Sequence, residues 1–455
     1  MPKPARRHRQ RRPPRRPAHP DGIPHLVCAD TRGRIFDYPG LRMAGRSGRL
    51  FHPVPPEDLI PLPEGSELFV LPERRPVGWD PDRDEMVALD EDPFRPGAPV
   101  QAVAAFMAPA HTQTALAAFQ RTRPDLAPLP LFAYTAVGWW KGRFWAAGFR
   151  SDPDPRQDPA RFDPERIRRR AAAAMKAAPG NRLVQHLGKC ALTYACPAAR
   201  NYFLGRWEAP LPASPACNAR CLGCLSLQGP GGPQRPQERI RFTPTADEIA
   251  GVAVPHLERA PRPVVSFGQG CEGEPLLQAA LLEEAIRAIR ARTRRGTVNL
   301  NSNASRPGAV ERLAAAGLDS LRISLNSARP DRYAAYYRPV GYVFDDVVET
   351  WRRAKRAGLF VSLNYFVFPG LSDQEAEAAA LEDLVGELGL DLIQLRNHNI
   401  DPDWFLEQVP DRADEPRIGV RALVRRLAAR FPALRIGYFN PCLDALPAPG
   451  LRPPA

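Results

Sequence analysis

Residues 214–224 read SPACNARCLGC and place cysteines at positions 217, 221 and 224. Three thiolates this close together suit an iron–sulfur cluster in which one iron lacks a protein ligand. A structural zinc site instead uses four closed ligands, usually two pairs separated by a dozen or more residues. No second pair follows Cys224, and the nearest downstream histidine is His256. The spacing therefore favours an iron–sulfur cluster with one open position.

This run resembles the cysteine motif of the radical S-adenosylmethionine (SAM) enzymes. The resemblance implies that Cys217, Cys221 and Cys224 are the catalytic metal ligands of a [4Fe-4S] cluster, and that SAM chelates the fourth iron. It also implies the chemistry of the family, in which the reduced cluster cleaves SAM to a 5′-deoxyadenosyl radical that attacks a substrate. The motif departs from the family in one place, because Gly223 stands where relatives commonly carry an aromatic residue.

A second motif follows the apolar run Val264–Phe267, which is typical of a short buried strand. Residues 268–275 read GQGCEGEP, and their three glycines allow the backbone to approach a ligand closely. The end of this loop resembles the Gly-Gly-Glu-Pro element of the same family. The resemblance implies that Gly273 and Glu274 meet the amino group of SAM.

From this loop onward, strands and helices alternate, which predicts a parallel sheet built from right-handed βαβ units. With a first strand just before Cys217, the pattern gives six units, and the resemblance to the radical SAM family implies a partial (β/α)6 TIM-type barrel over residues 207–440. The expected strands are 264–267, 297–303, 321–325, 360–366 and 392–395, and the main expected helices are 245–257, 276–290, 306–316, 373–388 and 418–431.

Polar residues end several of these strands, where a parallel barrel binds its ligands. By resemblance, Asn301, Asn303, Ser324 and Asn326 are placed to hold the ribose and carboxylate of SAM, and residues 394–397 to read its adenine. Arg338 is a candidate partner of the SAM carboxylate, since arginine binds carboxylates through two parallel hydrogen bonds. Each residue also fits a plain loop or helix-end role.

The N-terminal part resembles no family that we recognise. Turn-separated apolar runs at 26–36 and 135–147 predict β-hairpins, and residues 100–119 can include a helix, so residues 21–160 form a β-rich or α+β module. Trp139, Trp140 and Trp145 can stack on a planar substrate or lie in the core of the module. Two helices, 164–178 and 182–203, are expected in a connector over 161–206, and residues 441–455 form a Pro-rich tail.

The first 20 residues hold eight of the positive charges and no acidic residue, which predicts a disordered basic tail. Such a tail can bind nucleic acid by releasing counterions, although it can equally be without function. The chain has no apolar run long enough to span a membrane and no apolar core of a signal peptide. Eight cysteines in 455 residues form no disulfide framework, so we expect a cytoplasmic protein.

Four further cysteines, Cys190, Cys196, Cys271 and Cys442, lie in or near the barrel half. Their spacing argues against an auxiliary cluster, although four thiols are enough for one. Cys190 falls on an apolar helix face, which is typical of a buried core thiol. Cys271 lies in the loop expected to face SAM, where a hydrogen-donor role is a hypothesis.

The sequence thus predicts a radical SAM enzyme with an unidentified substrate and a flavodoxin- or ferredoxin-type electron donor. The alternative is a nucleic-acid-binding or scaffold protein with a structural or sensory cluster. The Gly-Glu-Pro loop favours the enzyme, because a purely structural cluster has no use for a SAM pocket.

Overall fold

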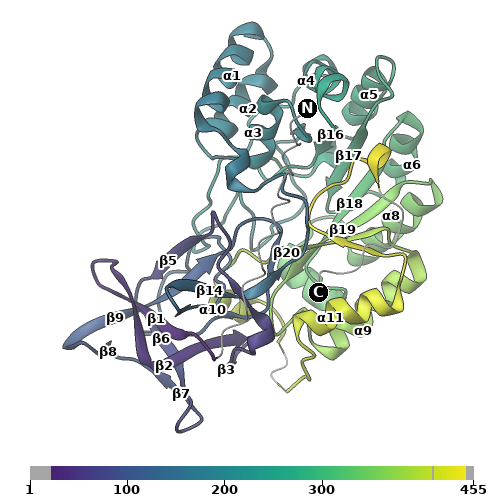
Figure 1. Cartoon of the computed structure of the whole chain (residues 1–455). Coiled ribbons are helices and arrows are strands. Elements are labelled where there is room, and N and C mark those ends of the chain that lie inside the picture. Colours follow the sequence, from purple (N-terminus) through teal and green to yellow (C-terminus); the bar gives the residue numbers. More distant parts are fainter. Residues whose placement is uncertain (1–21, 412–413, 447–455) are drawn as a thin grey trace, which may run out of the picture.

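The computed structural model describes residues 22–411 and 414–446, which fall into three parts (Figure 1). An antiparallel β module lies at the lower left, a group of three helices at the upper left, and a parallel barrel at the right. The predicted basic tail lies outside the described residues, as does the chain after residue 446.

The barrel sheet contains only parallel strands, which follow one another in chain order. This confirms the predicted partial TIM-type barrel. One short strand at the far edge was not predicted, so the sheet has seven strands rather than six. The strands are β15 (Glu208–Pro210), β16 (Val264–Phe267), β17 (Thr297–Ser302), β18 (Ser320–Leu325), β19 (Phe360–Val367), β20 (Leu392–Asn397) and β21 (Arg435–Gly437).

Helices cover the outer face of the barrel and start or stop at recognisable signals. Thr245 and Glu248 form a capping box at the start of α4, and Gly317 ends α6 with a φ of 110°. The buried strand residues, such as Val265, Leu300 and Ile323, form one continuous core with these helices. The helices are α4 (Ala246–Arg259), α5 (Ala279–Arg290), α6 (Pro307–Ala316), α7 (Pro330–Tyr337), α8 (Phe344–Arg356), α9 (Glu375–Leu388), α10 (Pro402–Gln408) and α11 (Val420–Arg430).

The N-terminal module is an antiparallel sheet, as the hairpin patterns predict. Its strands are β1 (His25–Asp30), β2 (Ile35–Ser47), β3 (Leu50–Pro53), β4 (Leu59–Pro61), β5 (Glu67–Leu71), β6 (Arg74–Asp80), β7 (Glu85–Ala88), β8 (Glu91–Asp92), β9 (Arg95–Phe106), β10 (His111–Gln113), β11 (Leu116–Ala117), β12 (Phe119–Arg121), β13 (Val137–Trp140) and β14 (Arg143–Arg150).

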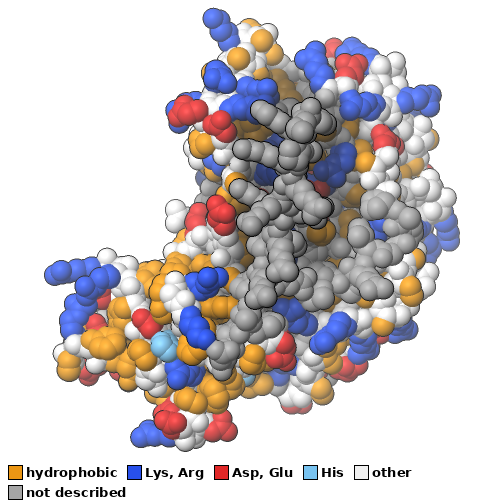
Figure 2. Space-filling model, in the orientation of Figure 1, with side chains coloured by type: hydrophobic (Ala, Val, Ile, Leu, Met, Phe, Trp, Pro, Cys, Tyr) orange, Lys and Arg blue, Asp and Glu red, His pale blue; other side chains and the backbone are white. Residues whose placement is uncertain are grey.

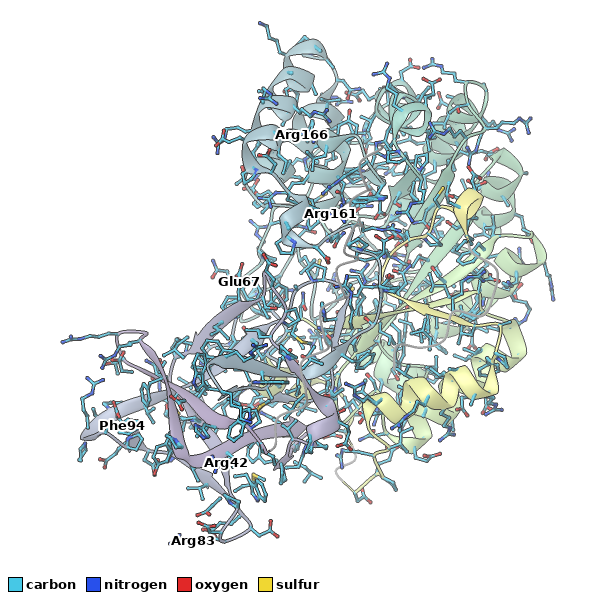
Figure 3. All side chains as sticks on the ribbon, viewed as in Figure 1. Arg42, Glu67, Arg83, Phe94, Arg161 and Arg166 are labelled. Carbon is cyan, nitrogen blue, oxygen red and sulfur yellow. The ribbon has the colours of Figure 1, made fainter. Side chains whose placement is uncertain are left out.

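The helix considered for residues 100–119 is wrong, because this segment contributes to strands β9 to β12. Strand β9 pairs with both β1 and β5, and these cross-strand partners outweigh the helical propensity of its alanines. Trp145 is buried in a small core of the module, and Trp140 packs against the same core. Hydrophobic side chains also gather on the module's surface (Figure 2), and the exposed Phe94 lies at its outer end (Figure 3).

The connector contains three helices rather than the two predicted: α1 (Pro164–Ala177), α2 (Arg182–Leu192) and α3 (Pro197–Leu204). The expected helix 182–203 is interrupted because Ala195 takes a left-handed φ of 54° and Pro197 begins a new helix. Arg161 and Arg166, labelled in Figure 3, mark where the connector begins.

Buried polar contacts join the module to the barrel at the carboxyl end of β20. Gln113 N–H donates to the Asn397 side chain over 2.8 Å, and Arg46 pairs with Asp403 at 2.6 Å. Arg74 lies 3.4 Å from the fully buried Asp401. The module therefore borders the edge of the barrel where parallel strands end. Within the described residues, no helix is long and apolar enough to cross a membrane.

Candidate functional site

The three cysteines lie in an irregular loop that follows β15 and is held by backbone hydrogen bonds. Arg220 N–H donates to Tyr337 O over 2.9 Å, and Leu222 N–H donates to Tyr336 O over 3.0 Å. Both acceptors belong to the last turn of α7. The end of α7 thus fixes the loop, which has no helix or strand of its own. We call residues 217–224 the cysteine loop.

The thiols of the cysteine loop are partly withdrawn from water. Burial raises the pKa of Cys217 to about 11 and raises that of Cys221 well above its ordinary value. Arg239 brings a guanidinium nitrogen to 3.4 Å from Cys224 Sγ. Deprotonated sulfurs in this setting need positive charge beside them, which a metal cluster and Arg239 can provide.

The three sulfurs suit a polynuclear cluster better than a single ion. Among the described residues, they do not form a group whose ligand atoms all lie within 4.8 Å of one another. Ligands of one tetrahedral ion lie closer than that, whereas a cluster spreads its cysteines over different irons. The donor set therefore fits the predicted [4Fe-4S] group.

The loop at 268–275 lies directly on the start of the cysteine-loop segment. Gly273 N–H donates to Ser214 O over 2.7 Å, and Glu274 N–H donates to Ala216 O over 2.8 Å. A Cβ on Gly273 would lie 2.0 Å from Ala216 O, so only glycine fits there. The two motifs recognised in the sequence are thus in direct contact.

The Glu274 carboxylate points toward the end of β17. It accepts hydrogen bonds from Ser302 Oγ over 2.6 Å, from Asn303 N–H over 2.8 Å and from Leu276 N–H over 2.9 Å. Burial raises the pKa of this carboxyl to about 6. Glu274 therefore ties the Gly-Glu-Pro loop to β17 through three hydrogen bonds.

Glu272 is a structural residue that sequence reasoning passed over. Its buried carboxylate accepts hydrogen bonds from the backbone N–H groups of Ala213, Ser214, Gly268 and Gln269. Burial raises its pKa to about 7, while the four N–H groups stabilise the anion. Only its place beside the Gly-Glu-Pro tripeptide signalled this role.

Asn301 and Asn303 lie at the end of β17, but other side chains already contact them. Asn301 Nδ2 donates to Gly268 O over 2.9 Å, and its Oδ1 accepts from Asn299. Asn303 Nδ2 donates to Asn218 Oδ1 over 2.9 Å, which links the third strand to the cysteine loop. Both residues are brought to the predicted site.

Ser324 is the next-to-last residue of β18 and is partly buried. Asn326 follows the strand directly, is buried, and has no hydrogen-bond partner at its Oδ1. Arg338 is exposed, has a left-handed φ of 47° and donates to Gln408 over 2.9 Å. Gln394 was expected near adenine. Its side chain accepts a hydrogen bond from Arg322 and donates one to the side chain of Asn440.

A cavity of about 840 Å³ opens beside the cysteine loop. This volume falls within the usual range for sites that hold small molecules. Cys221 and Cys224 lie on its wall, together with Arg239, Arg338 and Trp404. Arg338 therefore lines a cavity that reaches two of the three cluster cysteines, although it was selected from sequence for a different reason.

Gly223 has an aromatic neighbour although the motif lacks the usual aromatic residue. Its backbone hydrogen bonds to the hydroxyl of Tyr336, and a Cβ on Gly223 would lie 2.7 Å from that oxygen. Tyr336 comes from α7 and is buried. A side chain at position 223 would therefore have to displace the Tyr336 hydroxyl, which occupies the adjoining space.

The remaining cysteines of the barrel half do not all lie together. Cys442 lies near Thr297 at the amino end of β17, opposite the ligand-binding edge. The thiol of Cys271 lies against α2, beside Cys190 and His186, rather than facing the cysteine loop. The hydrogen-donor hypothesis for Cys271 thereby loses its geometric basis.

Residues 211–382 match the family model described as the Radical SAM superfamily. The matched segment contains the cysteine loop, the Gly-Glu-Pro loop and strands β16 to β19. The barrel part of this chain is therefore a radical SAM domain. Proteins of this superfamily use a [4Fe-4S] cluster and SAM.

Curated relatives match about a third of the chain. The GTP 3′,8-cyclase of Streptomyces coelicolor is 31% identical over 167 residues, which cover 35% of this chain and 44% of that protein. The GTP 3′,8-cyclase of Heliobacterium modesticaldum is 33% identical over 162 residues, covering 35% and 46%. The chain thus matches less than half the length of these relatives.

Solved structures give similar matches at lower identity. A radical SAM methyltransferase from Sphaerobacter thermophilus has a TM-score of 0.36 and 18% identity, covering 54% of this chain and 70% of that one. Methylornithine synthase has a TM-score of 0.36 and 15% identity, covering 60% and 74%.

Proposed function

We propose that this protein is a radical SAM enzyme that cleaves SAM reductively and acts on a substrate not yet identified. The observation that carries the proposal is the contact between its two motifs, through the hydrogen bonds from Gly273 to Ser214 and from Glu274 to Ala216. A cluster that only stabilised the fold would not need this second loop. When bound, the cluster and SAM supply the 5′-deoxyadenosyl radical that attacks the substrate.

The residues of this chain position and shield those groups. Cys217, Cys221 and Cys224 would hold the cluster, and Gly273 and Glu274 would meet the amino group of SAM. Arg239 stabilises negative sulfur at Cys224 through a 3.4 Å contact. Asn301, Asn303, Ser324, Asn326 and Arg338 stay predictions as SAM contacts.

The cavity beside the cysteine loop supports a role in electron or ligand access. Its wall includes Cys221 and Cys224 together with Leu227 and Val340, which are exposed apolar residues. We infer that an electron donor of the flavodoxin or ferredoxin type serves this protein. Nucleic-acid binding by residues 1–20 and a cytoplasmic location stay predictions.

The substrate is not transferred from the relatives. The curated matches are named GTP 3′,8-cyclases, but the shared segment is 35% of this chain and less than half of those proteins. We infer that residues 21–160 form a separate module that contributes to substrate choice, joined through residues 161–206 to the barrel at 207–440. Its contacts at the end of β20, including Gln113 with Asn397, support this role.

The test is anaerobic. The full chain is reconstituted with iron and sulfide, reduced with dithionite and mixed with SAM, and 5′-deoxyadenosine is quantified. We expect product from the native chain and none from the variant with Cys217, Cys221 and Cys224 all changed to alanine. Cys442→Ala is the matched control, because it removes a buried thiol elsewhere. A reduced cluster that forms but neither binds nor cleaves SAM would reject the proposal and favour the structural-cluster alternative.

A further inference from the structure

A second group of metal-binding side chains forms where the connector meets the barrel. His186 and Cys190 lie four residues apart on α2, so they share one face of that helix. Cys271 reaches them from the loop after β16. The ligand atoms of all three lie within 4.8 Å of one another. We call these residues the second thiol group.

We propose that the second thiol group binds one zinc ion, with Nε2 of His186 and the sulfurs of Cys190 and Cys271 as its protein ligands. Two thiolates and an imidazole are the donor types that zinc prefers. Two thiolates also neutralise its double charge, so the complex can lie among apolar side chains. The fourth position would be filled by a further thiol or by water.

The distances fit a single ion. His186 Nε2 lies 3.5 Å from Cys190 Sγ. Tetrahedral zinc with bonds of about 2.0–2.3 Å separates its ligand atoms by about 3.3–3.8 Å. His186 Nε2 and Cys190 Sγ therefore already have the separation that zinc requires, and the sulfur of Cys271 lies within 4.8 Å of both atoms.

Burial and access also fit a metal site. Cys190 is 2% exposed and Cys271 6% exposed, so both thiols are shielded from water and oxidants. His186 is only partly buried, which leaves an approach from solvent. Cys196 lies next to the group, because its N–H donates to Cys190 O over 3.1 Å. Cys196 is therefore the candidate for the further thiol that would fill the fourth coordination position.

The proposed ion would link two parts of the chain that are 81 residues apart, α2 of the connector and the Gly-Glu-Pro loop. Cys271 lies two residues before Gly273, whose N–H donates to Ser214 O. The ion would therefore hold the outer side of the loop whose inner side contacts the cysteine loop. This role is structural and does not depend on the proposed radical chemistry.

The test measures zinc rather than activity. The full chain is produced with zinc available, and metals are counted by mass spectrometry on the native protein. We expect about one zinc per chain, and a thiolate-to-metal charge-transfer band when Co²⁺ replaces zinc. In His186→Gln and Cys271→Ser we expect at least about a 10-fold loss of zinc affinity in competition with a chelator. Cys442→Ala should keep its zinc.

Several results would overturn the proposal. One is a native chain that takes up no zinc, and another is full retention of zinc in both variants. A disulfide between Cys190 and Cys271 in the unreduced protein would also overturn it. So would extra iron that persists in the variant with Cys217, Cys221 and Cys224 changed to alanine. If Cys271→Ser fails to fold by circular dichroism, His186→Gln decides, since its side chain is partly exposed and its loss leaves the core intact.

Discussion

The cysteine loop and the second thiol group both contain cysteine sulfurs, but they arrange these sulfurs differently. The first takes three cysteines from eight consecutive residues and keeps their sulfurs apart, whereas the second brings distant residues to one point. The first was visible in the sequence because its spacing is local. The second needed the fold, because Cys271 meets α2 only once β16 has joined the barrel.

The loop 268–275 separates the two groups and contacts both. Gly273 and Glu274 donate to the segment that begins the cysteine loop, and Cys271 lies against α2. One short loop can therefore serve a reactive site on one side and an anchoring site on the other. Apart from the matched controls, the substitutions proposed here all act on the cysteine-loop side and leave the second thiol group unchanged.

The largest effect is expected when the cysteine loop loses all three thiols by alanine substitution. Iron and 5′-deoxyadenosine should fall to background, because no ligand of the cluster remains. Zinc should stay at about one per chain, because the second thiol group is untouched. Iron, zinc and product are measured on one preparation. Loss of both metals from a chain that still melts cooperatively would show that the two groups form one site.

The next effect is expected from Gly273→Ala. The added Cβ would lie 2.0 Å from Ala216 O, so one of the two loops must move. We expect a loss of about 1–3 kcal/mol in the free energy of unfolding, as for other overpacked sites, and at least a tenfold fall in SAM cleavage.

Gly308→Ala is the matched control for this change. A Cβ on Gly308 meets nothing within 4 Å in α6, so the variant should be as stable as the native chain or up to about 1 kcal/mol more stable. Urea unfolding and 5′-deoxyadenosine assays compare the two variants. Equal stability and equal SAM cleavage in the two variants would mean that the loop 268–275 can shift without loss of function.

The barrel could be predicted from the sequence because each strand is a short apolar run followed by a glycine-rich or polar end. Strand β16 was predicted to its exact bounds, and helix α6 to within one residue, since Gly317 marks its end. Strand β21 has three residues, two of them only partly buried, so its apolar signal is too weak to detect. Elements with local signals are therefore predictable, whereas a strand as short and partly exposed as β21 is not.

Contacts between distant segments lay beyond the sequence. The alanines of β9 have no local preference for a strand. They form one because β9 pairs with β1 and β5. In the same way, no local pattern shows that Glu274 would bond to Ser302 or that Cys271 would meet His186. The residue types of the candidate site were predictable, but not which of them would already be bonded to each other.

A smaller effect is expected from Glu274→Gln, and it depends on pH. Burial raises the pKa of Glu274 from 4.5 to about 6, so the folded chain holds more protons than the unfolded chain between these values. Native stability from this group is therefore present at low pH and lost as pH rises through about 6, by about 2 kcal/mol. The glutamine variant lacks this dependence.

Urea unfolding at several pH values between 4 and 7 measures this effect. The stability difference between the native chain and Glu274→Gln should be largest near pH 4 and should shrink by about 2 kcal/mol toward pH 7. Parallel curves for the two proteins would mean that Glu274 titrates at its ordinary pKa. Zinc content should be the same in both, because the change is on the inner side of the loop.

The smallest effect is expected from Tyr336→Phe. The hydroxyl of Tyr336 is hydrogen-bonded to the backbone of the partly buried Gly223, and losing one such hydrogen bond costs about 1 kcal/mol. Tyr134→Phe is the matched control, because it removes a buried hydroxyl that donates to Pro130 O in the N-terminal module. Both variants should lose similar stability, but only Tyr336→Phe should weaken SAM binding, since only its hydroxyl supports the residue before the third cysteine. Equal SAM affinity in the two variants would mean that the aromatic ring alone fills the space beside Gly223.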